Sequence, residues 1–266
     1  NVSKPTTQVL VYFTDTATAS SRFTLNDDVR GELDSIYTLS GDTGTDIAGD
    51  AFMTSVRRGR PSQFFDEFDA GTATVGLNNM DRDYDPLYVA GPWYGDLRPG
   101  KRIQVITEGV VIYEGKVADW DLSYEVGGRS SAMLRSEDAL ATLGRTYFNA
   151  WTATASQLAG ARLNAAISRS EVNWSGGARD FDLGISLLQG DSVTWGSNVL
   201  NYCQLVAGSD LGAFFASRNN LLTFRDRHSN LLGAADLLED ERCRVGCRWR
   251  VRDVHVGGWW SGDPMV

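Results

Sequence analysis

The sequence predicts a mainly β protein, with an antiparallel β-barrel or sandwich domain followed by a smaller α+β domain. Three observations predict this class. Apolar and polar residues alternate in short segments through the first half of the chain, as they do in half-buried strands. The chain has 28 glycines and only 6 prolines, which favours many turns between short strands. After Trp151 the apolar residues recur at steps of three and four, which is typical of amphipathic helices.

These patterns divide the chain into four predicted parts. We expect an N-terminal arm over 1–52, a β-barrel-like domain over 53–150, an α+β domain over 151–235 and a returning β segment over 236–266. The arm contains one short β-type run from Val9 to Phe13 and is otherwise too polar to bury itself alone. We therefore expect the arm to pack on the following domain or on a neighbouring subunit. The chain begins without Met and ends without an obvious closing element, which leaves open whether it continues in a longer protein.

The β-barrel-like part contains one clear hairpin. Its first strand covers Ile103 to Thr107, its turn is Glu108-Gly109, and its return strand starts at Val110. The strand pattern continues as far as Tyr124. Further strands are expected at Thr72 to Leu77 and at Ser130 to Arg135, with a turn at Gly127-Gly128 before the latter. Several antiparallel strands joined by polar turns favour a small barrel or sandwich.

Three helices are expected. Ser136 is placed to cap a short helix over Glu137 to Leu143, which ends at Gly144. The second helix follows Thr154 and Gln157, which have the spacing of a capping box. Its predicted apolar face is formed by Leu158, Ala161, Ala165 and Ala166, widened by Leu163 and Ile167.

The third helix has a predicted cap at Thr194 and a stop at Gly208. Its apolar face is expected to contain Trp195, Val199, Tyr202, Cys203 and Val206. A hairpin follows, with strands at Leu211 to Ala216 and Leu221 to Arg225. A helix packed on such a hairpin is the basis of the predicted α+β domain.

The charge of the chain argues against a nucleic-acid-binding protein. The formal net charge is −9, and the first 50 residues carry eight acids against three bases. A protein that binds DNA needs clustered Lys and Arg to replace counterions. The local exception is a set of alternating arginines, which we interpret as a solvated or subunit-facing strand face: Arg242, Arg244, Arg248, Arg250 and Arg252. The sequence contains neither a signal peptide nor an apolar run long enough to span a membrane.

The possible metal ligands do not form a complete site. Asp81, Asp83 and Asp85 alternate like the start of a calcium loop, but an EF-hand requires Gly at the sixth position and Glu at the twelfth, where this chain has Pro86 and Pro92. We interpret this segment as a turn. A zinc site needs four ligands. The available residues are Cys203, Cys243, Cys247, His228 and His255, and free thiols are the expected state of the cysteines.

Other candidate chemistry has structural interpretations. Arg57, Arg58 and Arg60 are expected to form ion pairs with Asp66, Glu67 and Asp69 within or between subunits. Gly71 to Thr74 lacks the Lys of a phosphate loop, and no G-x-S-x-G elbow occurs. The closely spaced acids Glu114, Asp119, Asp121 and Glu125 are expected to decorate a solvated strand face instead of forming a glycosidase pair.

The tryptophans have a similar interpretation. Most are expected to serve packing: Trp93, Trp120, Trp151, Trp174, Trp195 and Trp249. Trp259 and Trp260 are adjacent in a β-like segment, so their side chains would point to opposite faces. We expect one of them to be exposed or covered by a partner.

Three segments of the chain together form a recognisable set of motifs. The first is Ser55-Val56-Arg57-Arg58-Gly59-Arg60, the second runs from Phe68 to Asn79, and the third is Asp81-Arg82-Asp83-Tyr84-Asp85-Pro86-Leu87. This set resembles the minor tail proteins of long-tailed phages and prophages of actinobacteria. Weaker similarity continues through Gly91 to Gly100, Tyr113 to Trp120, Gly208 to Ala216 and Leu222 to His228. The similarity covers roughly residues 50–230.

The resemblance implies a virion protein with a β-barrel and an α+β insertion, similar to baseplate hubs at the tail tip. It implies assembly with copies of itself, with a trimer favoured and a hexamer as the alternative, and contact with other tail proteins. Contact with the host surface would be indirect. No catalytic, cofactor-binding or metal-binding residue, and no cofactor, is expected. The alternatives are a distal tail ring protein, a carbohydrate- or receptor-binding module and, least favoured, a wall-degrading enzyme.

Overall fold

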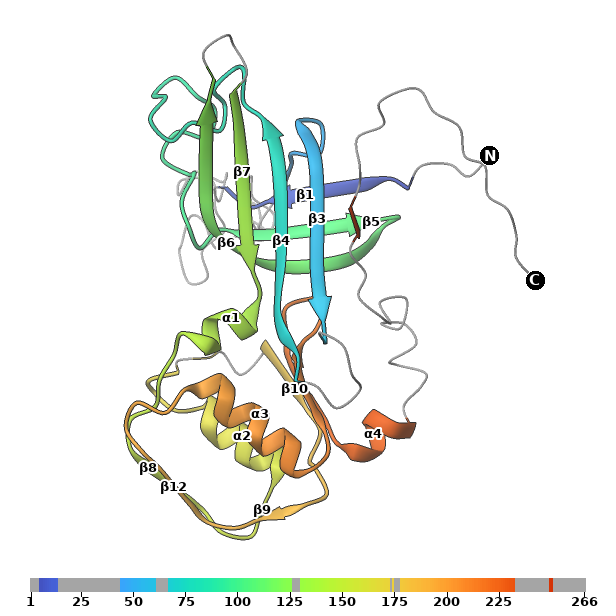
Figure 1. The fold of residues 1–266 in the computed structure, drawn as a ribbon, viewed down its shortest axis with the longest axis vertical. Coiled ribbons are helices and arrows are strands. Elements are labelled where there is room, and N and C mark those ends of the chain that lie inside the picture. Colours follow the sequence, from blue (N-terminus) through green and yellow to red (C-terminus); the bar gives the residue numbers. More distant parts are fainter. Residues whose placement is uncertain are drawn as a thin grey trace, which may run out of the picture.

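The computed structural model describes residues 5–13, 44–60, 67–125, 130–172, 174, 178–232 and 249–250. Within them the chain is mainly antiparallel β, with a large curved sheet and a smaller α+β part below it (Figure 1). This confirms the predicted fold class. The predicted boundaries between domains stay predictions, although the buried residues do form two separate clusters.

The large sheet has eight strands, each antiparallel to its neighbours, in the order β15-β3-β4-β7-β6-β5-β1-β2. The strands are β1 (Thr7–Val11), β2 (Thr45–Asp46), β3 (Ala51–Gly59), β4 (Asp69–Asn78), β5 (Arg102–Thr107), β6 (Val110–Tyr124), β7 (Ser130–Glu137) and β15 (Trp249–Arg250). Figure 1 shows β1 and β5 crossing the direction of β3, β4 and β7. The sheet therefore curves around its own inner face, as in an open barrel.

Strand β6 produces this curvature because it belongs to both halves of the sheet. Its first residues pair with β5, and its later residues pair with β7. Register shifts between Val105 and Ile106 and between Val117 and Asp119 mark bulges, which bend and twist a strand. The predicted hairpin turn is confirmed, since Glu108 and Gly109 both have positive φ, at 51° and 77°, as a tight two-residue turn requires.

The inner face of the sheet is filled by alternating strand residues. The side chains of Val9, Val11, Ile103, Val105 and Tyr113 are all inaccessible to solvent. The segment between β4 and β5 covers one side of this core. Within it, Trp93 stacks on Phe13 at 4.5 Å between ring centroids, and the buried Tyr84 donates a hydrogen bond to Asp50 over 2.7 Å.

The α+β part packs helices on short strands. Its helices are α1 (Ala139–Gly144), α2 (Ala159–Ile167), α3 (Val199–Ser209) and α4 (Arg227–Leu232), and its strands are β8 (Trp151–Ala153), β9 (Gln157–Leu158), β10 (Arg179–Phe181), β11 (Leu187–Leu188), β12 (Asp191–Val193), β13 (Ala213–Ala216) and β14 (Leu222–Arg225). The hairpin β13–β14 is as predicted, and β10 joins β14 in parallel to complete a three-stranded sheet. None of the helices in the described ranges is long and apolar enough to cross a membrane.

The predicted helix starts are wrong in each of the three helices. Strand pairing continues through Glu137, so Ser136 lies in β7 and Asp138 caps α1 by accepting from the Leu140 amide at 2.9 Å. Gln157 pairs as a strand residue, and α2 begins after it with no side-chain cap. Helix α3 is capped by Asn198 in place of Thr194 and continues past Gly208 to Ser209.

The predicted apolar faces are confirmed in part. Val199, Tyr202, Cys203 and Val206 are buried in α3, as expected, whereas Trp195 precedes the helix and is 79% exposed. In α2, Leu163, Ala166 and Ile167 are buried, but Ala161 and Ala165 are only half-buried because the packed face is rotated toward Ala159 and Arg162.

Candidate assembly surfaces

The two parts of the molecule are joined by a buried polar junction centred on Asp138. The Asp138 carboxylate accepts from the Gly71 amide of β4 at 2.6 Å and from the Leu140 amide of α1 at 2.9 Å. Burial raises the pKa of Asp138 to about 6, although these backbone hydrogen bonds favour the charged form. A Cβ at position 71 would lie 2.5 Å from the Asp138 carboxylate, so glycine is required there. The contact therefore ties β4 directly to the start of the α+β part.

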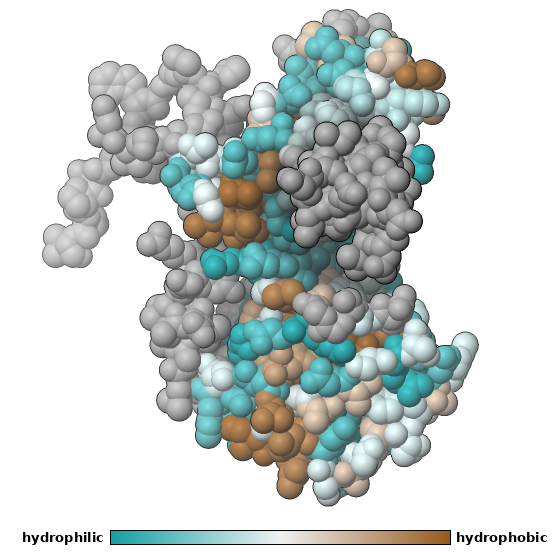
Figure 2. Space-filling model, turned by 180° about the vertical axis from the view of Figure 1, so that it is seen from behind, coloured by the Kyte–Doolittle hydropathy of each residue, from teal (hydrophilic) through white to brown (hydrophobic). Residues whose placement is uncertain are grey.

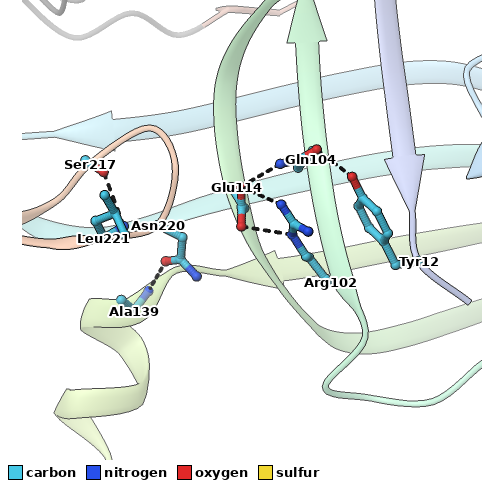
Figure 3. A network of polar contacts seen from close by, with 8 residues as sticks. All are labelled: Tyr12, Arg102, Gln104, Glu114, Ala139, Ser217, Asn220 and Leu221. Carbon is cyan, nitrogen blue, oxygen red and sulfur yellow. Dashed lines mark hydrogen bonds and ion pairs between the residues drawn. The ribbon is translucent and has the colours of Figure 1, made fainter. Parts of the chain in front are cut away.

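Further hydrogen bonds cross the same junction. Arg58 of β3 donates to the Ile112 carbonyl at 3.1 Å and to the Ala216 carbonyl of β13 at 2.9 Å. The Asn220 side chain accepts from the Ala139 amide at 2.7 Å, a contact drawn in Figure 3. These bonds connect the turn of the β13–β14 hairpin to α1 and to the large sheet, which gives the two parts a fixed contact.

An arginine inside the α+β part fastens a two-stranded ribbon. The pairs β8–β12 and β9–β11 form this ribbon, which runs along the end of the molecule farthest from the large sheet (Figure 1). Arg162 of α2, 2% exposed, donates to the Thr154 carbonyl at 2.6 Å and to the Gln189 carbonyl at 2.8 Å, one on each side of the ribbon. It also donates to the Gln157 side chain at 2.8 Å. The guanidinium thus holds both sides of the ribbon against the helix.

A buried carboxylate fixes the segment 183–187 that enters the ribbon. Asp210, inaccessible to solvent at the end of α3, accepts from the amides of Ile185 at 3.2 Å and Ser186 at 2.6 Å. Arg227 lies 3.6 Å from Asp210 and also donates to the Ser186 hydroxyl at 2.6 Å. At the other end of the segment, the Gly160 amide donates to the Leu183 carbonyl at 3.0 Å. The backbone of this segment is therefore held in place from within the protein.

Apolar side chains project from this fixed segment into solvent. Leu183 is 73% exposed, Leu187 is 68% exposed and the neighbouring Leu211 is 57% exposed. Figure 2 shows hydrophobic surface gathered near the lower end of the α+β part. A second group of exposed apolar residues lies in the segment between β4 and β5 and comprises Met80, Leu87, Val89 and Tyr94. Exposed apolar groups on a rigid backbone are typical of surfaces that bind other proteins.

The outer face of the large sheet carries a polar network, drawn in Figure 3. Tyr12 donates to Gln104 at 2.7 Å, and Gln104 in turn donates to Glu114 at 2.6 Å. Arg102 pairs with Glu114 at 2.9 Å and stacks over the Tyr12 ring. Glu114 is thus saturated with hydrogen bonds from its own sheet and stabilises the pairing of β1, β5 and β6.

The other acids in and after β6 make separate local contacts or are exposed. Asp121 forms an exposed ion pair with Arg135 at 3.3 Å, and Asp119 accepts from the adjacent Trp120 amide at 2.8 Å. Glu125 follows the strand and is exposed. Glu114, Asp119 and Asp121 therefore lie on the outer side of β6, as expected for acids on a strand face.

The segment after β4 forms a turn, as predicted. Asp85 accepts from the Leu87 amide at 2.9 Å and forms an ion pair with Arg82 at 2.7 Å. Although burial alone raises the pKa of Asp85, these bonds outweigh it and lower the pKa below its usual value. Within the described ranges, His, Cys, Asp and Glu side chains do not gather in groups of three that could hold a metal.

The predicted ion pair is confirmed for Arg57 and is wrong for Arg58, while the predicted partner Asp66 lies outside the described residues. Arg57 pairs with Asp69 at 3.3 Å, in an exposed contact. Arg58 instead binds backbone carbonyls at the junction, and Arg60 stacks over the Phe68 ring. The difference arises because β3 turns alternate side chains to opposite faces, which separates Arg58 from the acids near Asp69.

The remaining predicted residues divide between buried positions and positions outside the described residues. Cys203 is a buried free thiol whose pKa is raised by burial, and His228 lies in α4. Trp93 and Trp120 pack against the core of the large sheet, while Trp151 and Trp174 pack against the α+β core. The predictions that fall outside the described residues concern Cys243, Cys247, His255, Trp259, Trp260 and the arginines 242, 244, 248 and 252, together with most of the N-terminal arm.

Solved structures with a similar fold are proteins of phage tails and related machines. A search of family models and a search of curated proteins found no match. The tail protein of Neisseria meningitidis MC58 superposes with a TM-score of 0.51 at 12% identity, covering 82% of this chain and 50% of that one. The 43 kDa tail protein of prophage MuSo2 from Shewanella oneidensis gives a TM-score of 0.49 at 12% identity, covering 82% of this chain and 53% of that one.

A third similar structure is the c3393 protein of E. coli, a component of the type VI secretion system described as structurally similar to the bacteriophage T4 tail proteins gp27 and gp5. It gives a TM-score of 0.45 at 14% identity, covering 68% of this chain and 46% of that one. The chain thus spans about half the length of these structures. Over the matched 82% of its length, this chain shares the fold of the matched half of the Neisseria tail protein.

Proposed function

We propose that this chain is a structural component of the tail tip of a long-tailed phage or prophage of actinobacteria. In this proposal it is a baseplate hub-like minor tail protein that joins the tail tube to the host-recognition apparatus. The observation that carries the proposal is the fold shared with the Neisseria tail protein over 82% of this chain. The sequence motifs around Arg57 to Arg60 and Asp81 to Asp85 support the same assignment independently of the fold.

The chemistry of the described residues supports a structural role without catalysis. Buried ionisable groups serve the framework: Asp138 holds the junction, Arg162 holds the ribbon and Asp210 holds the segment 183–187. In a catalytic site such groups would converge on a shared space with perturbed pKa values. Here each one is occupied by backbone groups of its own fold. We therefore propose that the protein is not an enzyme and binds no cofactor.

Assembly with copies of itself and with other tail proteins follows from this role. A hub of three subunits is the favoured arrangement, and a distal tail ring of six is the alternative. The protein would be made in the host cytoplasm and would reside in the virion, at the tail tip. Closed rings cover surfaces that a monomer would leave exposed, which suits the apolar segments described above.

A carbohydrate-binding module is the second candidate function, and the exposure of Trp195 is the observation that favours it. Its ring is 79% exposed, on a turn fixed by a hydrogen bond from the Gly196 amide to the Phe148 carbonyl at 2.9 Å. Exposed aromatic rings stack on sugars. However, this reading predicts a cluster of surface tryptophans, and within the described ranges Trp93, Trp120, Trp151 and Trp174 pack against the two cores.

The experiment is to place the protein in the particle. Tails are purified from a producing strain in which this chain carries an epitope tag, and labelled tails are imaged by electron microscopy. We expect label at the tip, with threefold symmetry of the reconstructed layer for a hub and sixfold symmetry for a distal ring. Absence of the chain from purified tails would refute the proposal. Zymography on cell-wall material tests the enzyme alternative, where a cleared band would refute the non-catalytic assignment.

A further inference from the structure

We propose that the charge-poor end of the α+β part is a contact surface for a second copy of this chain. This inference rests on the proposed function, because it names a partner and a surface for the expected self-assembly. We call the surface the neutral end and define it as residues 151–161 and 183–209 together with Leu211. It contains the ribbon, the fixed segment 183–187 and the outer side of α3.

The neutral end lacks charge to an unusual degree. Residues 151–161 and 183–209 include 18 exposed residues, and Asp191 is the only charged residue among them. Charged residues make up 22% of the whole chain, and surfaces of soluble proteins carry more than the average. Depletion of charge around exposed Leu and Trp residues is the compositional signature of a protein interface core. The composition therefore distinguishes this end from ordinary solvated surface.

The apolar centre of the neutral end is organised in advance of any contact. Asp210 and Arg227 fix the backbone of Ile185 and Ser186 from inside, while Gly160 fixes Leu183. Arg162 holds the adjoining ribbon on both sides. Because the backbone is already ordered, a partner that binds here would not have to order it. Buried polar groups thus maintain a surface that is itself apolar.

Charge identifies a second copy as the occupant. Each chain has a formal net charge of −9, so two copies repel each other in most orientations. Contacts through charged faces would place like charges together, and each such contact is destabilising. Because Asp191 is the only exposed charged residue in the ranges 151–161 and 183–209, the neutral end allows two acidic molecules to touch with few like-charge contacts. A basic partner would gain nothing from this surface, because its charge would face uncharged groups.

The size of the apolar centre predicts a weak contact. Four exposed aliphatic side chains, Leu183, Ile185, Leu187 and Leu211, form a patch on the order of 300–600 Å², whereas a standard stable interface buries about 800 Å² on each partner. We therefore expect concentration-dependent association of the isolated chain. In a closed assembly the contact would be reinforced by the other interfaces.

Sedimentation velocity of the full 266-residue chain tests the inference. Wild type is compared with Leu187→Asp and Leu183→Asp over concentrations from about 5 to about 500 μM. Each variant places an unpaired carboxylate in the apolar centre, which is costly to bury, and should weaken association at least about tenfold. The matched control is Val110→Asp, since Val110 is 47% exposed at the start of β6, lies outside both groups of exposed apolar residues and should leave association unchanged. Circular dichroism and thermal melts establish that each variant is folded.

Salt gives a second, independent measurement. Raising the ionic strength screens the repulsion between two acidic chains, so association through an uncharged surface should become tighter. A wild-type chain that stays monomeric throughout the range would overturn the inference. Equal weakening of association by the control variant Val110→Asp would also overturn it, and so would association that becomes weaker as salt is added. Its failure is distinguishable from failure of the proposed function, because the tag experiment depends on tail incorporation and this one on purified protein.

Discussion

Replacing Gly160 with alanine tests the packing of α2 against the backbone that follows β10. A Cβ at position 160 would lie 1.8 Å from the Asp182 carbonyl oxygen, whereas ordinary contacts begin at 3.4 Å, so the carbonyl must withdraw by about 1.6 Å. The Gly160 amide also donates to the Leu183 carbonyl at 3.0 Å, and the Asp182 amide donates to the Phe224 carbonyl at 3.0 Å. The withdrawal strains both hydrogen bonds.

The magnitude follows from these losses. Overpacking costs about 1–3 kcal/mol and each lost hydrogen bond about 0.5–1.5 kcal/mol, while alanine regains up to about 1 kcal/mol as a better helix former. We expect Gly160→Ala to lower the free energy of unfolding by about 3 kcal/mol. The matched control is Gly208→Ala in α3, where a Cβ would meet nothing within 4 Å. That variant should raise the free energy of unfolding by about 0.5–1 kcal/mol.

Urea denaturation followed by circular dichroism measures both variants, and hydrogen exchange of the α2 and α3 amides reports whether the α+β part is the unit affected. The prediction is refuted if the free energy of unfolding of Gly160→Ala lies within about 0.5 kcal/mol of the wild-type value, because the Asp182 carbonyl would then move aside without destabilising the fold. It is also refuted if Gly208→Ala destabilises to the same extent, since the loss would then not come from the close approach.

Two further predictions concern buried polar groups. Arg162→Met leaves the carbonyls of Thr154 and Gln189 unpaired, so we expect the free energy of unfolding to fall by about 2–4 kcal/mol and hydrogen exchange in the ribbon to become faster. The stability of Arg162→Lys should lie between those of wild type and Arg162→Met. Equal stability of all three proteins would contradict the role assigned to Arg162. Asp138 has its pKa raised from 3.8 to about 6, so the folded state binds the proton more tightly than the unfolded state. The resulting stabilisation is complete below about pH 4 and is lost as the pH rises through 6. Between pH 4 and 7 the free energy of unfolding of wild type should therefore fall by up to about 3 kcal/mol relative to that of Asp138→Ser, as measured by urea denaturation at each pH. A difference between the two proteins that does not change with pH would contradict the raised pKa.

The sequence predicts the strands better than the helix ends, for a physical reason. The hairpin around Glu108-Gly109 is a local signal, because two residues of suitable conformation between alternating strands determine it. Helix caps are decided by tertiary contacts that the sequence does not display. Ser136 has a side chain suited to capping, yet the pairing of β7 with β4 and β6 keeps this residue in a strand. The helix therefore begins later, and Asp138 caps it.

The candidate surfaces could be predicted from the sequence only in part. The long uncharged stretch from residue 192 to residue 209 is visible without a structure and could have been noticed as a composition signal. The roles of Arg162 and Asp210 could not be predicted from the sequence. Their partners are backbone groups 27 and 25 residues away, respectively, and backbone groups carry no sequence signature. The exposure of Trp195 was also hidden, because its spacing from Val199 matches a helix face that starts only after it.

The continuity of β6 has a mechanical consequence. One strand of 15 residues is hydrogen-bonded to β5 along its first part and to β7 along its later part. Within the hydrogen-bonded order of the sheet, β6 is therefore the strand that connects β1 and β5 to β7, which leads to Asp138 and α1. Because β7 leads directly into α1, we expect a change in the twist of the sheet to be transmitted to the α+β part.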